Sequence, residues 1–259
     1  MRKFNWSGLS LNDGAFRVRE TNLFDAAEMQ VATEDLARDD GLVQLYERMG
    51  GRQIEFSGYI RAEDQDAADA AIDLLKKRLT YVRGVGAMTV DFPEGDRVWF
   101  GKVINKNIGR SNTDISRATY SFVLQTPKPY GSAATGLQEF APAQTITTSA
   151  ITAQVNNIGT YLAKPLITLT ITSNSDELAE FRIGNPETSQ YVSFTVSNLQ
   201  PGDAITIDCD LSKVFHNSEE LRPFGVFPAW LPEIGLIEYN DSMTNRSVIM
   251  TTGFIPRYL

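Results

Sequence analysis

The 259-residue sequence has few of the residues that metal and redox sites need, with one cysteine, Cys209, and one histidine, His216. A single cysteine excludes an internal disulfide framework and every zinc site built from several thiolates. A single histidine excludes motifs that bind a metal through two imidazoles. No apolar run reaches the roughly 20 residues of a transmembrane helix, so we expect a soluble protein without membrane insertion.

Positive charge is also scarce, because 24 lysines and arginines stand against 32 aspartates and glutamates, a formal net charge of -8. A protein with this balance gains little from releasing counterions at nucleic-acid phosphates, so a nucleic-acid reader is disfavoured. The densest basic cluster is Lys76-Lys77-Arg78. Its place at the end of a predicted helix explains it without a phosphate ligand.

The sequence contains a strand and then a helix in its first half. Ile54, Phe56 and Ile60 alternate as on one face of a strand. Acidic residues then open the helical stretch and the basic cluster closes it, an order that complements the helix dipole. Between them, apolar residues recur at a three-to-four spacing and predict the buried stripe of an amphipathic helix: Ala68, Ala71, Ile72, Leu75 and Leu79.

Further strands complete a first domain over residues 1–131. Alternating apolar residues predict strands around Met88–Phe92 and Ala118–Leu124, and two prolines, at positions 127 and 129, end the last one. The segment Ala26–Arg48 tolerates a helix in composition, but its spacing is irregular and we assign it no fold. The first domain is therefore predicted to be mostly β with one helix.

The second half of the chain predicts a different architecture. Residues 132–149 are rich in Ala, Thr, Ser and Gln without a clear period, which indicates a linker or an irregular first strand. Residues 150–259 contain short alternating strands separated by turns such as Gln200–Asp203. This pattern is typical of an antiparallel β-sandwich.

Candidate chemistry in the sequence is sparse. Asp203, Asp208 and Asp210 could hold a hard cation, but a turn and a solvated strand face explain them better, because calcium-loop spacing is missing. His216 has no evident nucleophile partner, which favours a turn or surface role, and Cys209 lies on the apolar side of its strand. We predict no catalytic, cofactor-binding or metal-binding residues.

The order of the elements resembles the distal tail protein (Dit) family of long, non-contractile-tailed bacteriophages. The strand Gly51–Ile60 and the helix after it are similar to the family's strand-then-helix core, and Tyr120–Leu124 running into Pro129-Tyr130 is similar to its domain-closing strand. In the second half, Pro201–Asp208 resembles the family's Gly-Asp turn and following strand. Phe227–Pro232 resembles its Phe-Pro-x-Leu-x-Pro segment.

The resemblance implies a structural virion protein, with no enzymatic activity and no cofactor. It implies an N-terminal belt domain over 1–131, a linker over 132–149 and a galectin-like β-sandwich over 150–259. Family members form a homo-hexameric ring that joins the tail tube protein above to tail-tip, tail-fibre or receptor-binding proteins below. DNA passes through the ring without specific binding. The expected location is the tail tip of the virion, after synthesis in the host cytoplasm.

A ring that passes DNA favours a lumen without cations, because phosphates would adhere to them. The acidic segment from residue 20 to residue 40 could line this lumen or lie between subunits, and a solvated loop is the alternative interpretation. The candidate residues are Glu20, Asp25, Glu28, Glu34, Asp35, Asp39 and Asp40.

Two hypotheses from other classes stay open. The second domain could be a carbohydrate-binding module that contacts host-surface glycan, although a shared fold does not establish a shared function. A glycan-cleaving enzyme would need two carboxylates at a suitable separation, and no motif among the 32 acidic residues selects such a pair.

Overall fold

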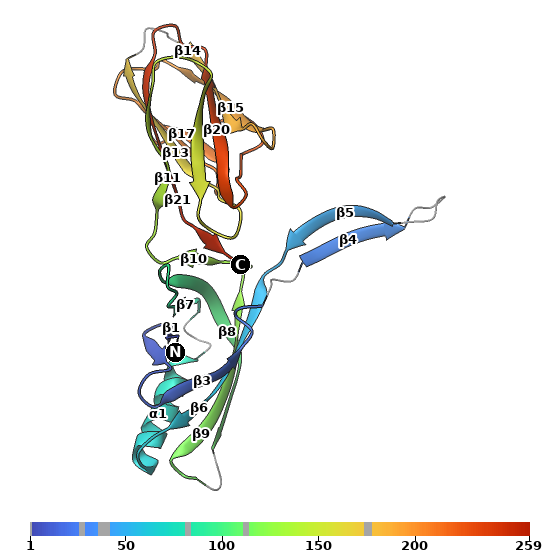
Figure 1. The fold of residues 1–259 in the computed structure, drawn as a ribbon, viewed down its shortest axis with the longest axis vertical. Helices are drawn as coiled ribbons and strands as arrows, with labels where there is room; N and C mark the ends of the chain where they lie inside the picture. The colour runs from blue at the N-terminus through green and yellow to red at the C-terminus, as the bar shows by residue number, and fades with distance from the viewer. Residues whose placement is uncertain (1, 26–28, 36–41, 81–83, 111–113, 174–177) are drawn as a thin grey trace. The chain divides into compact units, whose positions relative to one another are not determined.

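The computed structural model describes residues 2–25, 29–35, 42–80, 84–110, 114–173 and 178–259, with the backbone alone for 29–35 and 42–48. Contacts between Cα atoms divide the chain into two units, Met1–Ala134 together with Leu259, and Thr135–Tyr258. Each unit has its own hydrophobic core. Most elements are strands, and the described residues contain one α-helix (Figure 1). The predicted mainly-β fold is confirmed.

The first unit is built on one antiparallel sheet. Seven of its strands follow the order β2-β1-β7-β8-β9-β6-β3, and β10 pairs with β8. The helix is α1 (Gln65–Arg78). The strands are β1 (Phe4–Trp6), β2 (Leu9–Leu11), β3 (Phe16–Thr21), β4 (Met29–Asp35), β5 (Leu42–Met49), β6 (Arg52–Arg61), β7 (Gly86–Val90), β8 (Arg97–Arg110), β9 (Arg117–Thr126) and β10 (Gly131–Ala133).

Strands β4 and β5 form a separate two-stranded hairpin. They occupy most of the segment Ala26–Arg48, to which the sequence assigned no fold. The pairing register shifts between Ala32 and Thr33. Such a shift breaks the two-residue alternation by which a strand is recognised, so the sequence pattern looked irregular.

Helix α1 packs on one face of the sheet, against β6 and β9. It begins at Asp64, whose carboxylate accepts a hydrogen bond of 2.8 Å from the Ala67 amide and so caps the helix. The predicted stripe is confirmed, because its five residues are all buried: Ala68, Ala71, Ile72, Leu75 and Leu79.

The basic end of α1 is tied to its surroundings by hydrogen bonds. Arg78 Nη1 donates to the Ser7 carbonyl at 2.9 Å, and Trp6 Nε1 donates to the Arg78 carbonyl at 3.1 Å. Lys76 pairs with Asp73 at 3.5 Å on the exposed side. The cluster therefore belongs to the helix C-terminus, as its charge pattern predicted.

The second unit is a β-sandwich, as predicted. One sheet has the order β11-β21-β13-β16-β17-β18, the other β12-β20-β14-β15-β19, and their buried side chains form one core. The strands are β11 (Gln138–Ile146), β12 (Ile151–Asn157), β13 (Leu166–Ser173), β14 (Leu178–Asn185), β15 (Gln190–Ser197), β16 (Ala204–Asp208), β17 (Lys213–His216), β18 (Glu219–Leu221), β19 (Phe224–Gly225), β20 (Glu233–Asp241), β21 (Ser247–Phe254) and β22 (Arg257–Tyr258).

Of the two interpretations of residues 132–149, a linker or an irregular first strand, the structure has the irregular strand. Strand β11 lies inside this range and pairs with β21, and its Phe140, Ala141 and Ile146 are buried in the sandwich core. The register shifts twice between Glu139 and Gln144. These irregularities hide the alternation of a strand from sequence reading.

We predict that Leu75→Ala lowers the free energy of unfolding by about 2–5 kcal/mol, because it leaves a cavity beneath α1. Lys77→Ala, on the exposed side of the same helix, should cost only about 0.3–1 kcal/mol through the lost dipole interaction. Urea denaturation of the full chain followed by tryptophan fluorescence measures both. Equal losses from the two variants would contradict this orientation of the helix.

Candidate functional site

The face of the first sheet that points away from α1 is open and polar. Along β6 the burial alternates, so Glu55, Tyr59 and Arg61 are exposed while their neighbours lie in the core. Strand β9 pairs with β6 over ten residues and continues the same face with serine, threonine and arginine side chains. A polar face of this kind can be exposed to solvent, contact another protein or line a passage.

Acidic residues gather at one end of this open face. Glu20, Asp25 and Glu55 line a hollow of about 370 Å³ together with the polar side chains Asn22 and Ser57. Glu20 and Asp25 belong to the predicted acidic set. Glu55 was missed because it lies outside the acidic segment, although its place in the alternation of β6 marks it as an outward-facing residue.

The structure brings together two of the seven predicted acidic residues. Glu34 and Asp35 are the last two residues of β4, opposite Val43 and Leu42 of β5. The remaining three, Glu28, Asp39 and Asp40, lie outside the described residues. A role for the acidic set in a lumen or an interface therefore stays a prediction.

The opposite end of the open face is basic. Arg61 of β6 and Arg117 of β9 are directly opposite each other and line a hollow of about 340 Å³ with Tyr59 and Thr119. Arg117 Nε lies 2.8 Å from Asp114 Oδ2. The open face thus changes from acidic to basic along β6.

Arg52 joins the two chain segments at the base of the β4–β5 hairpin. Its side chain is buried, and Nη2 donates to the carbonyls of Asn22 at 2.5 Å and Leu23 at 2.8 Å. Burial lowers the pKa of Arg52, while the charge of Asp25 opposes this change. Asn22 adds a hydrogen bond to Gln53. These bonds therefore join the chain segment after β3 to the start of β6, beside the acidic hollow.

The carboxylates and the histidine of the second unit serve turns. His216 Nε2 lies 2.9 Å from Asp203 Oδ2, and the Gln200 amide donates to the same oxygen at 2.7 Å. Burial alone would raise the pKa of the Asp203 carboxyl, but hydrogen bonds from Gln200, Asn217 and His216 outweigh it, so this pKa is lowered. The turn role predicted for His216 agrees with this geometry.

The other candidate groups are also held by local structure. Asp208 Oδ1 accepts from the Asp210 and Leu211 amides at 2.9 Å, and Asp210 pairs with Arg257 at 2.7 Å. Cys209 is buried, and burial raises the pKa of its thiol to about 12. Within the described ranges, His, Cys, Asp and Glu side chains form no group of three that could hold a metal ion.

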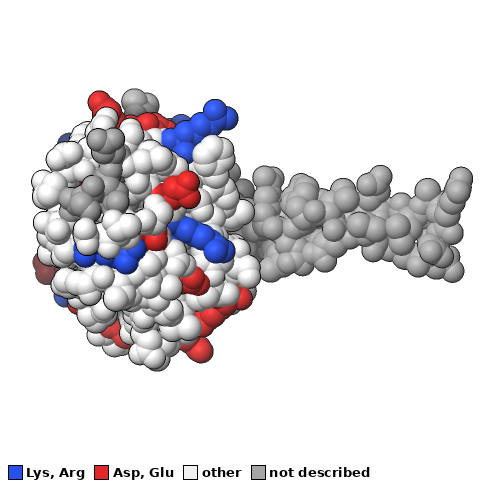
Figure 2. Space-filling model, turned by 90° about the horizontal axis from the view of Figure 1, so that it is seen from above, with Lys and Arg blue, Asp and Glu red and all other residues white. Residues whose placement is uncertain are grey.

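Charge on the molecular surface is mixed. On the face drawn in Figure 2, acidic and basic side chains are interspersed over the described part of the chain. None of the helices in that part of the chain has the length and hydrophobicity needed to cross a membrane.

No protein-family model and no curated protein matches the sequence. Among solved structures, the SPP1 Dit (gp 19.1) protein is similar over 100% of both chains, with a TM-score of 0.69 and 16% identity. The chain has the Dit fold. SPP1 Dit is described as a paradigm of the hub adsorption apparatus in Gram-positive infecting phages.

Two structures of a phage P2 baseplate are more distant from this Dit-fold chain. The activated conformation with Ca gives a TM-score of 0.46 at 7% identity, over 99% of this chain and 98% of the other. The activated conformation with Sr gives 0.44 at 8% identity, over 98% of both. The similarity to SPP1 Dit, by contrast, is stronger and covers both units of this chain.

We predict that Asp203→Asn lowers the free energy of unfolding at pH 7 and that the difference from the unchanged protein shrinks in acid. The Asp203 carboxyl has a lower pKa in the folded than in the unfolded protein, so its ionised form stabilises the fold. This stabilisation is complete above the unfolded-state pKa of about 3.9 and is lost as the pH falls through the folded-state pKa. Urea denaturation at pH 7 and in a series down to pH 3 measures it. The exposed control Glu187→Gln should differ little at any pH, and a constant deficit for Asp203→Asn would contradict the prediction.

Proposed function

We propose that this protein is a structural hub of a phage tail. It forms a homo-hexameric ring that joins the tail tube protein to the tail-tip, tail-fibre or receptor-binding proteins, and it acts without enzymatic activity. It is made in the host cytoplasm and resides at the tail tip of the virion. The observation that carries the proposal is the full-length similarity to SPP1 Dit, a protein described as a hub.

The first unit has features that a ring interface would use. A closed ring needs two different patches that meet between neighbouring subunits. Within the described residues, β2 and β3 are the outer strands of their sheet and leave backbone groups available for pairing. An isolated two-stranded hairpin is marginally stable in water, so the β4–β5 hairpin gains from packing on a neighbouring subunit.

We expect native mass spectrometry of the full chain to detect a closed assembly of six 28.8 kDa copies. A fragment of residues 1–134 should still oligomerise, because the proposed interfaces lie in the first unit, while residues 135–259 should be monomeric. The second fragment begins before β11, whose side chains belong to the sandwich core. A full chain that is monomeric at every concentration and in assembled tails would refute the ring. Oligomers formed by the second fragment alone would show that the interface lies in the second unit.

The acidic end of the open face is our candidate for the wall of the DNA passage. Glu20, Asp25 and Glu55 are close together there and would repel phosphates by charge. Serine side chains between the two ends of the face, Ser57 and Ser121, carry no charge to retain DNA. Only the acidic end is assigned to the passage, because Arg61 and Arg117 at the basic end of the face would retain phosphates.

We predict that the triple variant Glu20→Lys/Asp25→Lys/Glu55→Lys retains short duplex DNA at low salt, and that this binding weakens steeply as salt is added. The unchanged protein should not retain DNA under the same conditions. Fluorescence anisotropy with labelled DNA measures both, after mass spectrometry has checked the assembly. The control Glu139→Lys/Glu187→Lys/Glu219→Lys has the same charge change at exposed positions of the second unit, and equal DNA binding by this control would contradict the lumen assignment.

A further inference from the structure

The outer face of the five-stranded sheet in the sandwich carries an aligned row of side chains. Arg182 of β14 is paired in register with Asn240 of β20 and with Ser193 of β15, and Ser193 is paired with Phe224 of β19. The residues next to them on these strands, such as Phe181, are buried in the core. Because side chains alternate along a strand, the row of four lies on the outside.

This row crosses a hollow in the surface. The hollow has a volume of about 450 Å³, and the next row of the same face, Glu180, Thr195 and Ser242, also lines it. Phe224 is 64% exposed, an unusual position for a large apolar ring. The volume lies within the range of about 300–1,000 Å³ that is usual for small-molecule sites.

The polar groups of the hollow are held in place before any ligand arrives. The Arg182 guanidinium lies 3.8 Å from the centre of the Tyr191 ring, and the Tyr191 hydroxyl donates to Glu238 at 2.8 Å. Asn240 Nδ2 donates to the other oxygen of Glu238 at 2.6 Å. Gly184 makes room for this ring, because a Cβ there would lie 2.6 Å from Tyr191 Cδ1 and 2.1 Å from the Gln190 carbonyl.

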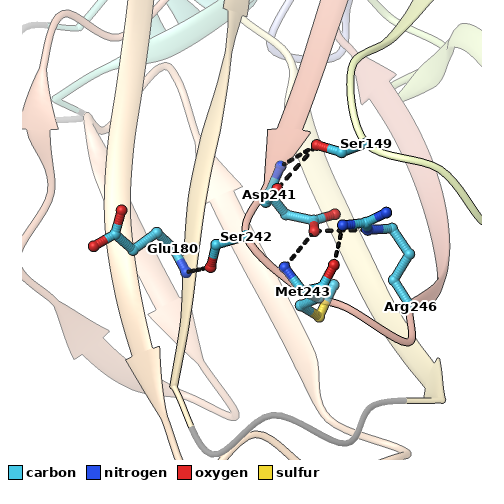
Figure 3. A network of polar contacts seen from close by, with 6 residues as sticks. All are labelled: Ser149, Glu180, Asp241, Ser242, Met243 and Arg246. Carbon is cyan, nitrogen blue, oxygen red and sulfur yellow. Dashed lines mark hydrogen bonds and ion pairs between the residues drawn. The ribbon is translucent and has the colours of Figure 1, made fainter.

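A second network fixes the end of the hollow near Ser242 (Figure 3). Ser242 Oγ accepts from the Glu180 amide at 2.9 Å. The side chain of the next residue back, Asp241, is fully buried and accepts from Arg246 Nε at 2.7 Å and from the Met243 amide at 2.8 Å. The loop that follows β20 is therefore braced from within.

Two charged groups in the hollow keep their bonding capacity for a ligand. In the part of the chain that the structure describes, the Arg182 guanidinium stacks on Tyr191 but makes no hydrogen bond or ion pair, and neither does the Glu180 carboxylate. A guanidinium offers several donors and a carboxylate offers acceptors, and the hydroxyls of Ser193 and Thr195 offer both. An exposed aromatic ring adds an apolar surface beside them.

We propose that this hollow binds a saccharide. Sugar hydroxyls can both donate and accept hydrogen bonds, which matches a lining that mixes the guanidinium of Arg182, the carboxylate of Glu180, an amide and hydroxyls. The C–H face of a sugar ring can pack on Phe224. The carboxylate of Glu180 disfavours an anion such as phosphate, and the polar lining disfavours an apolar ligand. The site lies within the second unit and does not depend on the proposed ring.

The test is binding of the full chain to an array of neutral and amino-sugar oligosaccharides, with the tightest hit titrated by calorimetry. Arg182→Ala and Phe224→Ala should each weaken binding at least tenfold, with unchanged thermal melts. The matched controls Arg19→Ala and Phe100→Ala remove exposed side chains of the same type from the first unit and should bind like the unchanged protein.

Three results would overturn the proposal. They are the absence of binding to every saccharide, binding that neither Arg182→Ala nor Phe224→Ala weakens, and equal weakening by the controls. If these two variants instead lose a tail protein without any saccharide binding, the hollow is a protein contact and the proposal is wrong. Each of these results leaves the hexamer measured by mass spectrometry unaffected, so the two proposals can fail separately.

Discussion

The pairing of β6 with β9 organises the first unit. Over ten residues, from Arg52 opposite Thr126 to Arg61 opposite Arg117, the register is continuous. Because side chains alternate, this one register directs Phe56 and its apolar neighbours toward α1 and leaves a polar face open. A slip by one residue would exchange the two faces, so both the core and the open face depend on it.

At Gly58, strand β6 lies very close to atoms of β3 and β9. A Cβ at this position would lie 2.1 Å from the Arg17 carbonyl and 2.6 Å from the Tyr120 hydroxyl, which itself donates to that carbonyl at 3.1 Å. Glycine weakens an isolated strand, but here it admits a buried tyrosine that joins β9 to β3. At the start of β6, Arg52 joins this strand to the chain segment that follows β3, next to the acidic hollow.

The division into two units places the proposed ring interface and the proposed saccharide site on different parts of the chain. Each unit buries its own core, so a surface of the second unit can carry a binding site without altering the sheet proposed for the ring. The hollow around Arg182 is formed by four neighbouring strands of one sheet. Sites built on strands are held more precisely than sites on loops.

Elements with an unbroken period, such as the strand around Ala118–Leu124 and the helix containing Leu75, could be predicted from the sequence, because a local repeat depends only on neighbouring residues. The sequence assigned no fold to the segment of the β4–β5 hairpin and left β11 open between a linker and an irregular strand, since bulges shift the alternation of these strands. The folded chain alone brings Glu55 next to Glu20 and Asp25, and makes the side chains of four strands line one hollow. These contacts join residues far apart in the chain, and no local pattern specifies which strands will pair.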